Sequence, residues 1–192
     1  DNIRQNGRVL EAHFLAYLYQ TNQYELADWV RENVCFPSCM VDRITPRTHD
    51  SLRFEVDSLF PGFGQTSVQT EEYTQWVIED NFNGEFPDLT QVGVTITNDL
   101  EPYEETKIRI LNGGHTSLAY LGVLSGYNTF DEVMNDKAHL KHFKQLQTEE
   151  IIPSIGNNLP FDIHEYLESV EERLSAAYNH DDLERICMDG FT

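Results

Sequence analysis

Four polar residues with complementary chemistry lie close together near the middle of the sequence: Glu104, Lys107, Asn112 and His115. In a regular α-helix each residue advances by about 100° around the axis. With Lys107 at zero, Glu104 lies at about 60°, His115 at about 80° and Asn112 at about 140°. A carboxylate, an amine, a carboxamide and an imidazole would then share one helical face.

That face also carries apolar side chains. Ile108 and Leu111 fall on it, so the polar groups would lie on an apolar background. We expect this burial to lower the pKa of Lys107, because loss of water disfavours the ammonium form. A lysine shifted toward neutrality can act as a general base.

The pair Gly113-Gly114 interrupts the same helix at a cost of roughly 1 kcal/mol per residue. A substrate, a cofactor or a tightly crossing helix that approaches the backbone would each explain it. A plainer interpretation is also open. Glu104 and Lys107 could form a surface pair that contributes a few tenths of a kcal/mol, with His115 as a packed core histidine.

The surrounding sequence predicts a mainly α protein with a small β element. Pro102 suits the first turn of a long helix that begins at Glu101. Capping residues precede two later helices, at Thr129 with Glu132 and at Asp162 with Glu165. Apolar periodicity and β-branched runs predict the remaining elements: helices over 3–19 and 24–34, and strands over Gln75–Glu79 and Val92–Thr97.

Two segments are predicted to be non-helical. Residues 35–46 carry Pro37 and Pro46, which favour an extended or loop conformation. Residues 50–70 contain Pro61-Gly62-Phe63-Gly64 and are predicted to be irregular. No repeat or linker divides the chain, so we expect one domain over residues 1–192.

Composition excludes several functional classes. The chain of 192 residues is 40% hydrophobic and can bury a core, which argues against disorder. Its net charge of −20 disfavours nucleic acids and anionic membranes as partners. Three cysteines and no apolar signal segment favour a reducing, cytoplasmic setting. No stretch approaches the roughly 18 apolar residues of a membrane span.

Five segments in order along the chain carry a further signal: Asp1–Gly7, Phe36–Pro46, Gln75–Asp80, Lys107–His115 and Arg185–Gly190. Together they resemble the mannitol dehydrogenase family, the polyol-specific long-chain dehydrogenases. The segment Lys-x₄-Asn-x₂-His, preceded by Glu, resembles the active-site helix of that family.

The resemblance implies hydride transfer between a secondary alcohol and NAD or NADP, without a metal. Lys107 would be the general base. Asn112 and Asn2 would donate hydrogen bonds to the oxygen that becomes alkoxide-like, and His115 would hold a neighbouring substrate hydroxyl.

More distant roles follow from the same resemblance. Asp42 and Arg185 would bind further substrate hydroxyls, and Glu104 would relay the proton to solvent. The partner would be a polyol or ketose, with mannitol to fructose first and arabinitol or sorbitol next.

The glycine-rich turn of a dinucleotide-binding fold, Gly-x-Gly-x-x-Gly, is absent from this sequence. We therefore expect the chain to be the carboxy-terminal, substrate-binding domain of a longer polypeptide, without the family's amino-terminal Rossmann domain. Its missing partner would be that domain, and the chain alone would not turn over a polyol.

Other interpretations remain open. A sugar-acid reductase of the same family, for fructuronate or tagaturonate, would need a cation for the substrate carboxylate, for which the candidates are Arg4, Arg43 and Arg185. A non-catalytic helical module that binds a partner through its acidic face is a second alternative.

Several conspicuous residues have plainer interpretations. Cys35 and Cys39 lack the further ligands that zinc needs, so we expect no metal. The acidic pairs are predicted to be solvated faces: Glu71-Glu72, Glu171-Glu172 and Asp181-Asp182.

Overall fold

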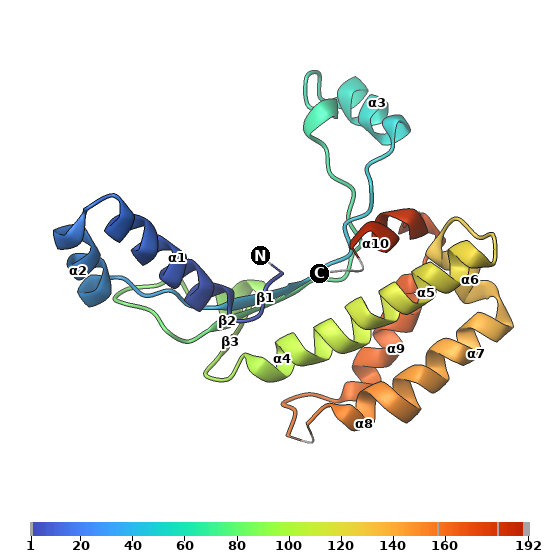
Figure 1. Ribbon diagram of the computed structural model, residues 1–192. Helices are drawn as coiled ribbons and strands as arrows, with labels where there is room; N and C mark the ends of the chain where they lie inside the picture. Colours follow the sequence, from blue (N-terminus) through green and yellow to red (C-terminus); the bar gives the residue numbers. More distant parts are fainter. Residues whose placement is uncertain (1, 157, 180, 190–192) are drawn as a thin grey trace. The chain divides into compact units, whose positions relative to one another are not determined.

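The computed structural model describes residues 2–156, 158–179 and 181–189 (Figure 1). The chain divides into two compact units. Unit 1 comprises Asp1–Asp42 and Thr74–Glu104, and unit 2 comprises Arg43–Tyr73 and Glu105–Thr192. Asp1 and Gly190, the outer ends of two segments that carry the family resemblance, lie outside the described residues.

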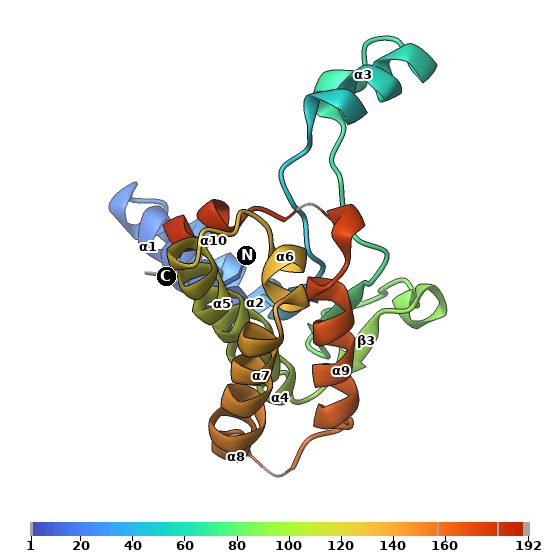
Figure 2. The ribbon, with the colours of Figure 1, turned by 90° about the vertical axis from the view of Figure 1, so that its right-hand side faces the viewer.

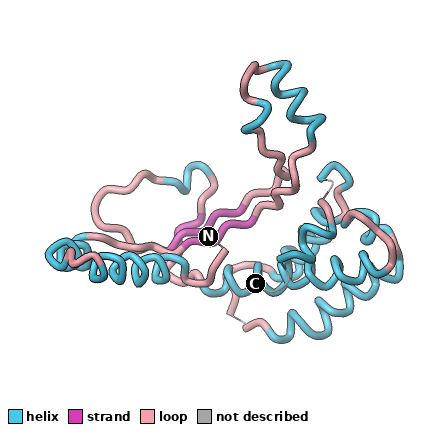
Figure 3. Tube along the Cα trace, turned by 45° about the horizontal axis from the view of Figure 1, so that its top comes forward, coloured by secondary structure: helices cyan, strands magenta, loops and turns pink. Residues whose placement is uncertain are grey.

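Unit 1 combines the helices α1 and α2 and the short 3-10 helix η2 with a three-stranded sheet, drawn in magenta in Figure 3. The strand order is β1-β2-β3. β1 pairs antiparallel with β2, matching Met40 with Val77, and β2 pairs parallel with β3, matching Ile78 with Ile96. The elements are α1 (Asn6–Gln20), α2 (Tyr24–Asn33), β1 (Cys39–Asp42), β2 (Gln75–Glu79), η2 (Leu89–Val92) and β3 (Thr95–Thr97).

Unit 1 buries two small apolar clusters. One joins α1 to α2 through Leu18, Ala27 and Val30. The other includes Met40 and Val77 on the sheet. Gly7 allows α1 to approach the chain before β1, because a Cβ there would lie 2.2 Å from the Phe36 carbonyl oxygen.

Unit 2 is helical and has the larger core. Figure 2 shows α5 beside α7, and α5 also contacts α10. Phe130, Phe143, Leu118 and Val170 are buried in that core. From Lys107 onward the elements of unit 2 are η3 (Lys107–Asn112), α5 (Gly113–Leu124), α6 (Phe130–Asn135), α7 (Lys137–Gln145), η4 (Leu146–Ile151), α8 (Ile152–Ser154), α9 (Ile163–Leu174), η5 (Ala177–Asn179) and α10 (Leu183–Asp189). α4 (Glu101–Thr106) precedes η3 along the chain.

Local sequence signals predicted several elements correctly. β2 has the predicted bounds, Gln75–Glu79. Thr129 and Glu132 form the predicted capping box of α6. The Asp162 carboxylate accepts the backbone N–H groups of His164 and Glu165 at the start of α9, as a capping aspartate does.

The prediction that residues 50–70 are irregular is wrong, because α3 (Asp50–Leu59) and η1 (Gly64–Thr66) lie within them. None of the α3 residues is fully buried. The turn after α3 is held by the Asp57 carboxylate, which accepts the backbone N–H groups of Gly62 and Gly64. The helix therefore ends in the turn that the Pro-Gly pair indicated.

The segment that carries Lys107 is a π-helix, η3, and the predicted regular α-helical geometry is wrong there. The backbone N–H of Gly113 reaches back to the Ile108 carbonyl, five residues earlier, which widens the turn. The predicted angle between Lys107 and Asn112 therefore does not apply.

Of the three explanations proposed for the glycine pair, a closely crossing helix is the one that accounts for Gly114. A Cβ on Gly114 would lie 2.6 Å from Gln147 Nε2 and 2.7 Å from Phe143 Cε2. Gln147, in the second π segment η4, donates from Nε2 to the Ile110 carbonyl at 3.0 Å. The two π segments are thus joined by a buried side-chain hydrogen bond.

No helix within residues 2–156, 158–179 and 181–189 is both long and apolar enough to cross a membrane.

Candidate active site

Unit 2 carries three of the predicted catalytic residues on consecutive helical segments. Lys107 begins η3 and Asn112 ends it, and His115 lies in the first turn of α5. Lys107 and His115 are each only 7% exposed, and Asn112 is half-buried. A lysine buried to this degree is unusual for its residue type, which excludes the plain surface-pair interpretation.

His115 is held between an aromatic ring and a carboxylate. Its imidazole lies 4.4 Å from the Phe130 ring, centroid to centroid, in a tilted arrangement. Its Nε2 lies 3.3 Å from Asp181 Oδ2. His115 is thus a packed histidine whose ring has a specific polar neighbour.

Asp181 contacts both His115 and Arg185 and is 4% exposed. Besides His115 it contacts Arg185, which donates from Nη2 to Oδ1 at 2.5 Å and from Nε to the same oxygen at 3.2 Å. The Arg185 side chain is 34% exposed, so its outer part reaches solvent. One buried carboxylate therefore serves two of the predicted site residues.

The pKa of Asp181 is lowered. Burial alone would raise it, but interactions with the His115 imidazole and with the Arg185 guanidinium outweigh that effect. Asp181 is therefore ionised at neutral pH.

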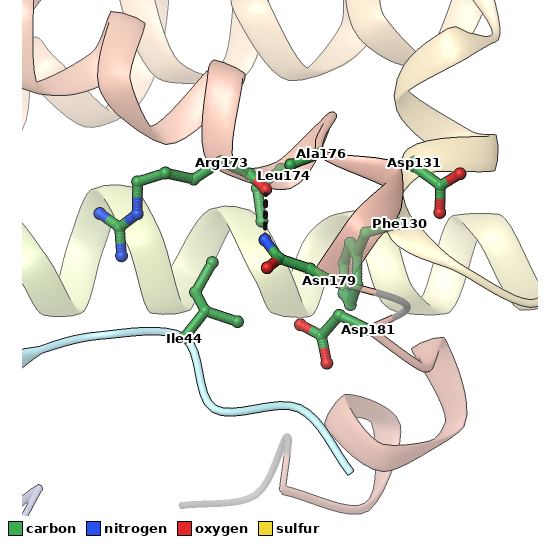
Figure 4. A pocket seen from close by; sticks show the side chains of 8 residues that line it. All are labelled: Ile44, Phe130, Asp131, Arg173, Leu174, Ala176, Asn179 and Asp181. Carbon is green, nitrogen blue, oxygen red and sulfur yellow. Dashed lines mark hydrogen bonds between the residues drawn. The ribbon is translucent and has the colours of Figure 1, made fainter. Parts of the chain in front are cut away.

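A narrow hollow lies beside this carboxylate, lined by residues of unit 2 (Figure 4). Phe130 and Asp181 lie at one end of it and the Arg173 guanidinium at the other, and Asn179 Nδ2 donates to the Arg173 carbonyl. The hollow is too narrow to admit a water molecule. Its remaining lining residues are Ile44, Asp131, Leu174 and Ala176.

Unit 1 carries the other predicted site residues: Asn2, Asp42 and Glu104. Asn2 is exposed, and Asp42, at the end of β1, is fully buried. Glu104 is 4% exposed and accepts the backbone N–H of Gln5 at 2.9 Å. Burial raises the pKa of Glu104, and the Gln5 hydrogen bond opposes that effect only in part.

Asp181 was missed by the sequence analysis, which assigned it to a solvated face. That assignment is wrong, as it is for Glu71, which is 1% exposed and bound by Arg173 in unit 2. Asp181 and Arg185 are four residues apart, a spacing that pairs opposite charges on a helix. This was the one signal that could have identified Asp181 in advance.

Across the described residues no three His, Cys, Asp or Glu side chains are grouped so as to hold a metal ion. Cys35 and Cys39 are free thiols.

Two family models match the chain in order. Residues 1–91 match the Mannitol dehydrogenase Rossmann domain, and residues 99–192 match the Mannitol dehydrogenase C-terminal domain. Together they cover all but residues 92–98. The chain therefore belongs to the mannitol dehydrogenase family.

The match over residues 1–91 corrects two expectations. The chain is not a carboxy-terminal domain alone, and its fold does not lack the Rossmann domain of the family. The expectation rested on the absent Gly-x-Gly-x-x-Gly turn, which marks only one short segment of such a domain. β1 and β2 lie within these residues, whereas β3 (Thr95–Thr97) lies in the short stretch between the two matches.

Individual relatives agree with this assignment. A mannitol dehydrogenase of Saccharomyces cerevisiae is 38% identical over 99% of this chain and 38% of the relative. A D-arabinitol 4-dehydrogenase of Ralstonia nicotianae is 38% identical over 100% of this chain and 41% of the relative. Mannitol 2-dehydrogenase of Pseudomonas fluorescens, solved in ternary complex with NAD and D-mannitol, is similar with a TM-score of 0.82 and 36% identity, over 97% of this chain and 38% of that one. The chain spans about two fifths of the length of the curated relatives named here.

Proposed function

We propose that this chain supplies the substrate-binding and proton-transfer residues of an NAD-dependent polyol dehydrogenase. The reaction is oxidation of a secondary alcohol of a sugar alcohol, with D-mannitol to fructose as the first candidate. The observation that carries the proposal is the burial of Lys107 on the same helical run as Asn112 and His115.

Lys107 takes the proton from the reacting hydroxyl. Burial favours this role, because it removes the water that stabilises an ammonium. Asn112 and Asn2 donate hydrogen bonds to the oxygen as negative charge develops on it, and fixed donors of this kind need no reorganisation during the reaction. When bound, NAD would supply the acceptor for the hydride from the carbon that bears the reacting hydroxyl.

The remaining residues bind substrate or carry the proton away. His115, Asp42 and Arg185 hold further hydroxyls of the polyol. Glu104 passes the proton from the lysine to solvent, a role supported by its raised pKa, since a carboxyl that is more readily protonated can accept and release a proton.

The proposal of NAD rests on the Rossmann-domain match and on the Pseudomonas fluorescens complex, whose title names NAD and D-mannitol. Lys107, Asn112 and His115 have side chains of the types needed to bind the alcohol substrate and to take up its proton. For the dinucleotide phosphates this sequence offers no Gly-x-Gly-x-x-Gly turn, so we assign no residue to them.

Pairing of the arginines favours a neutral polyol over a sugar acid. Arg4 pairs with Glu101 at 3.3 Å, and Arg185 pairs with Asp181. Arg43 donates to the Glu71 carbonyl. A substrate carboxylate would have to compete with these partners for each of the candidate cations.

The test is steady-state kinetics on the natural-length polypeptide that carries these residues, with D-mannitol, D-arabinitol, D-sorbitol and a sugar acid. We expect NAD-dependent oxidation of a polyol. Lys107→Ala should lower kcat/KM by about 10²–10⁴-fold, the usual range for loss of a general base. Lys141→Ala, an exposed lysine on α7, is the matched control.

Two results would contradict the proposal. Lack of activity of the natural-length polypeptide toward all polyols would defeat the dehydrogenase function, and a retained rate in Lys107→Ala would defeat the role of that lysine. The 192-residue chain alone is expected to give no turnover with mannitol and NAD.

A further inference from the structure

Among the described residues, the buried Asp181 carboxylate pairs with His115 and Arg185, and the proposed function gives both of them a substrate-binding role. We propose that Asp181 is a positioning residue that holds His115 in the tautomer protonated on Nε2 and neutralises Arg185, so that the site favours an uncharged polyol. This inference rests on the proposed function for its substrate and on the geometry of unit 2 for its mechanism.

The tautomer follows from the chemistry of the pair. A neutral imidazole carries one N–H, and an ionised carboxylate can only accept a hydrogen bond. Asp181 Oδ2 lies at ion-pair distance from His115 Nε2, 3.3 Å, and among the described residues neither atom has a well-aligned hydrogen-bond partner, so a proton on Nε2 is the one that this carboxylate stabilises. Nδ1 then keeps its lone pair, and His115 acts as an acceptor for the hydrogen of a substrate hydroxyl.

The position of Asp181 is fixed by backbone contacts to the start of α6. The Phe130 N–H donates to the Asp181 carbonyl at 3.2 Å, and Thr129 pairs with Asp182 in an isolated antiparallel bridge. Phe130 is also the ring that packs against His115. The first turn of α6 therefore holds Asp181 through its backbone and His115 through the Phe130 ring.

Within the part of the chain that the structure describes, His115 and Arg185 are the side chains that pair with the Asp181 carboxylate. The hollow beside it is too narrow for water, so solvent does not compete from that side. Arg185 binds through Nε and Nη2, while a third of its side chain stays exposed. Its exposed part can donate to hydroxyl oxygens, but its charge is already compensated.

The compensated charge determines specificity. An uncharged polyol needs only hydrogen bonds from Arg185, whereas a sugar acid gains from a free cation near its carboxylate. Removal of the Asp181 charge should therefore weaken binding of mannitol through His115 and strengthen binding of a sugar acid through Arg185.

The first experiment is independent of catalysis and uses the 192-residue chain. Long-range ¹H–¹⁵N NMR of the histidine rings, with His115 assigned from a His115→Gln variant, should show His115 protonated on Nε2 at neutral pH. Asp181→Asn should shift that ring toward a mixture of tautomers, and Asp182→Asn should leave it unchanged. A ring protonated on Nδ1 in the unmodified chain overturns the inference without any variant.

The second experiment measures kinetics in the natural-length polypeptide. For Asp181→Asn we expect KM for D-mannitol to rise about 10-fold or more, with a smaller change in kcat. The reason is that loss of a charge-assisted contact lowers binding affinity by about 10- to 100-fold. The ratio of kcat/KM for D-mannonate to that for D-mannitol should rise at least tenfold.

An equal fall for both substrates would overturn the neutralising role of Asp181. An unchanged tautomer in a folded Asp181→Asn chain would overturn the positioning role. If no polyol is oxidised at all, the proposed function fails, while the NMR result still decides the role of Asp181.

Discussion

Glu104 in unit 1 and Asp181 in unit 2 are buried to the same extent, each 4% exposed, yet their pKa values move in opposite directions. The pKa of Glu104 is raised, because burial is opposed mainly by one backbone N–H. The pKa of Asp181 is lowered, because an imidazole and a guanidinium contact it. Burial alone therefore does not determine what a carboxyl can do; its partners do.

Glu71 extends the comparison to a fully paired acid. Its carboxylate is bound by Arg173 through Nε and Nη2 and also accepts the Ile44 N–H. Arg173 is 6% exposed and lies over the Tyr73 ring, 4.0 Å from its centre. Both side chains of the Glu71–Arg173 pair are buried, whereas Asp181 is paired with Arg185, whose side chain is partly exposed to solvent. The Glu71–Arg173 pair is therefore suited to stabilising the fold, and the Asp181–Arg185 pair to binding a ligand.

The largest loss of stability is expected from removal of Arg173, the cation that pairs with Glu71. Arg173→Met should lower the free energy of unfolding by about 3–5 kcal/mol, because it leaves a buried carboxylate without its partner. Urea unfolding measures this loss, with the exposed Arg47→Met as the control. Equal stabilities of the two variants would show that Glu71 gains little from Arg173.

A smaller, pH-dependent loss is expected for Asp181→Asn. A lowered pKa in the folded state means that the ionised carboxylate stabilises the fold above the usual carboxyl pKa of 3.8, and that this contribution is lost as pH falls through the folded-state value. The loss should be about 1–3 kcal/mol at pH 7.

Urea unfolding of Asp181→Asn at pH 7 and at pH 3 measures that dependence, with Asp182→Asn as the control. A difference from the unmodified chain that is larger at pH 3 than at pH 7 would contradict it.

The smallest effect, of opposite sign, is expected for Glu104→Gln. A raised pKa means that the folded state favours the protonated carboxyl, so the unmodified chain loses stability as pH rises above the usual value of 4.5. The glutamine oxygen can still accept the Gln5 N–H. The variant should therefore match the unmodified chain at pH 4 and be slightly more stable at pH 7.

Thermal unfolding at the two pH values measures the effect of Glu104→Gln, with the exposed Glu85→Gln as control. A variant that is less stable than the unmodified chain at pH 7 would show that the Glu104 charge is better solvated than its burial indicates.

Sequence predicted the parts of the fold that are specified locally. The capping box at Thr129 and the strand Gln75–Glu79 follow from residues within a few positions of each other. α3 escaped prediction because the turn Pro61-Gly62-Phe63-Gly64 was taken to represent all of residues 50–70, whereas that turn only follows the helix. The Rossmann-domain match could not be predicted from a glycine-rich turn, because residues 1–91 contain no Gly-x-Gly-x-x-Gly.

The candidate site shows the same limit. Lys107 and His115 could be selected because they share one segment, and their burial agrees with the apolar face on which they were placed. For Asp181 the sequence offered only the four-residue spacing to Arg185, because its other partner, His115, lies far away along the chain and contacts it through the packing of α6 against the segment before α10. Acidic doublets such as Asp181-Asp182 are solvated in most proteins, and only tertiary contacts distinguish the exceptions.

The π-helical segment Lys107–Asn112 has a consequence for how this region tolerates change in length. A π turn holds one residue more than the α turn that it replaces. Deletion of a single residue within it would restore α-helical hydrogen bonding and rotate Lys107 relative to Asn112 and His115, even if every named side chain were kept. Substitutions at the neighbouring apolar positions would preserve that register, so the segment should be more sensitive to a one-residue deletion than to conservative replacement.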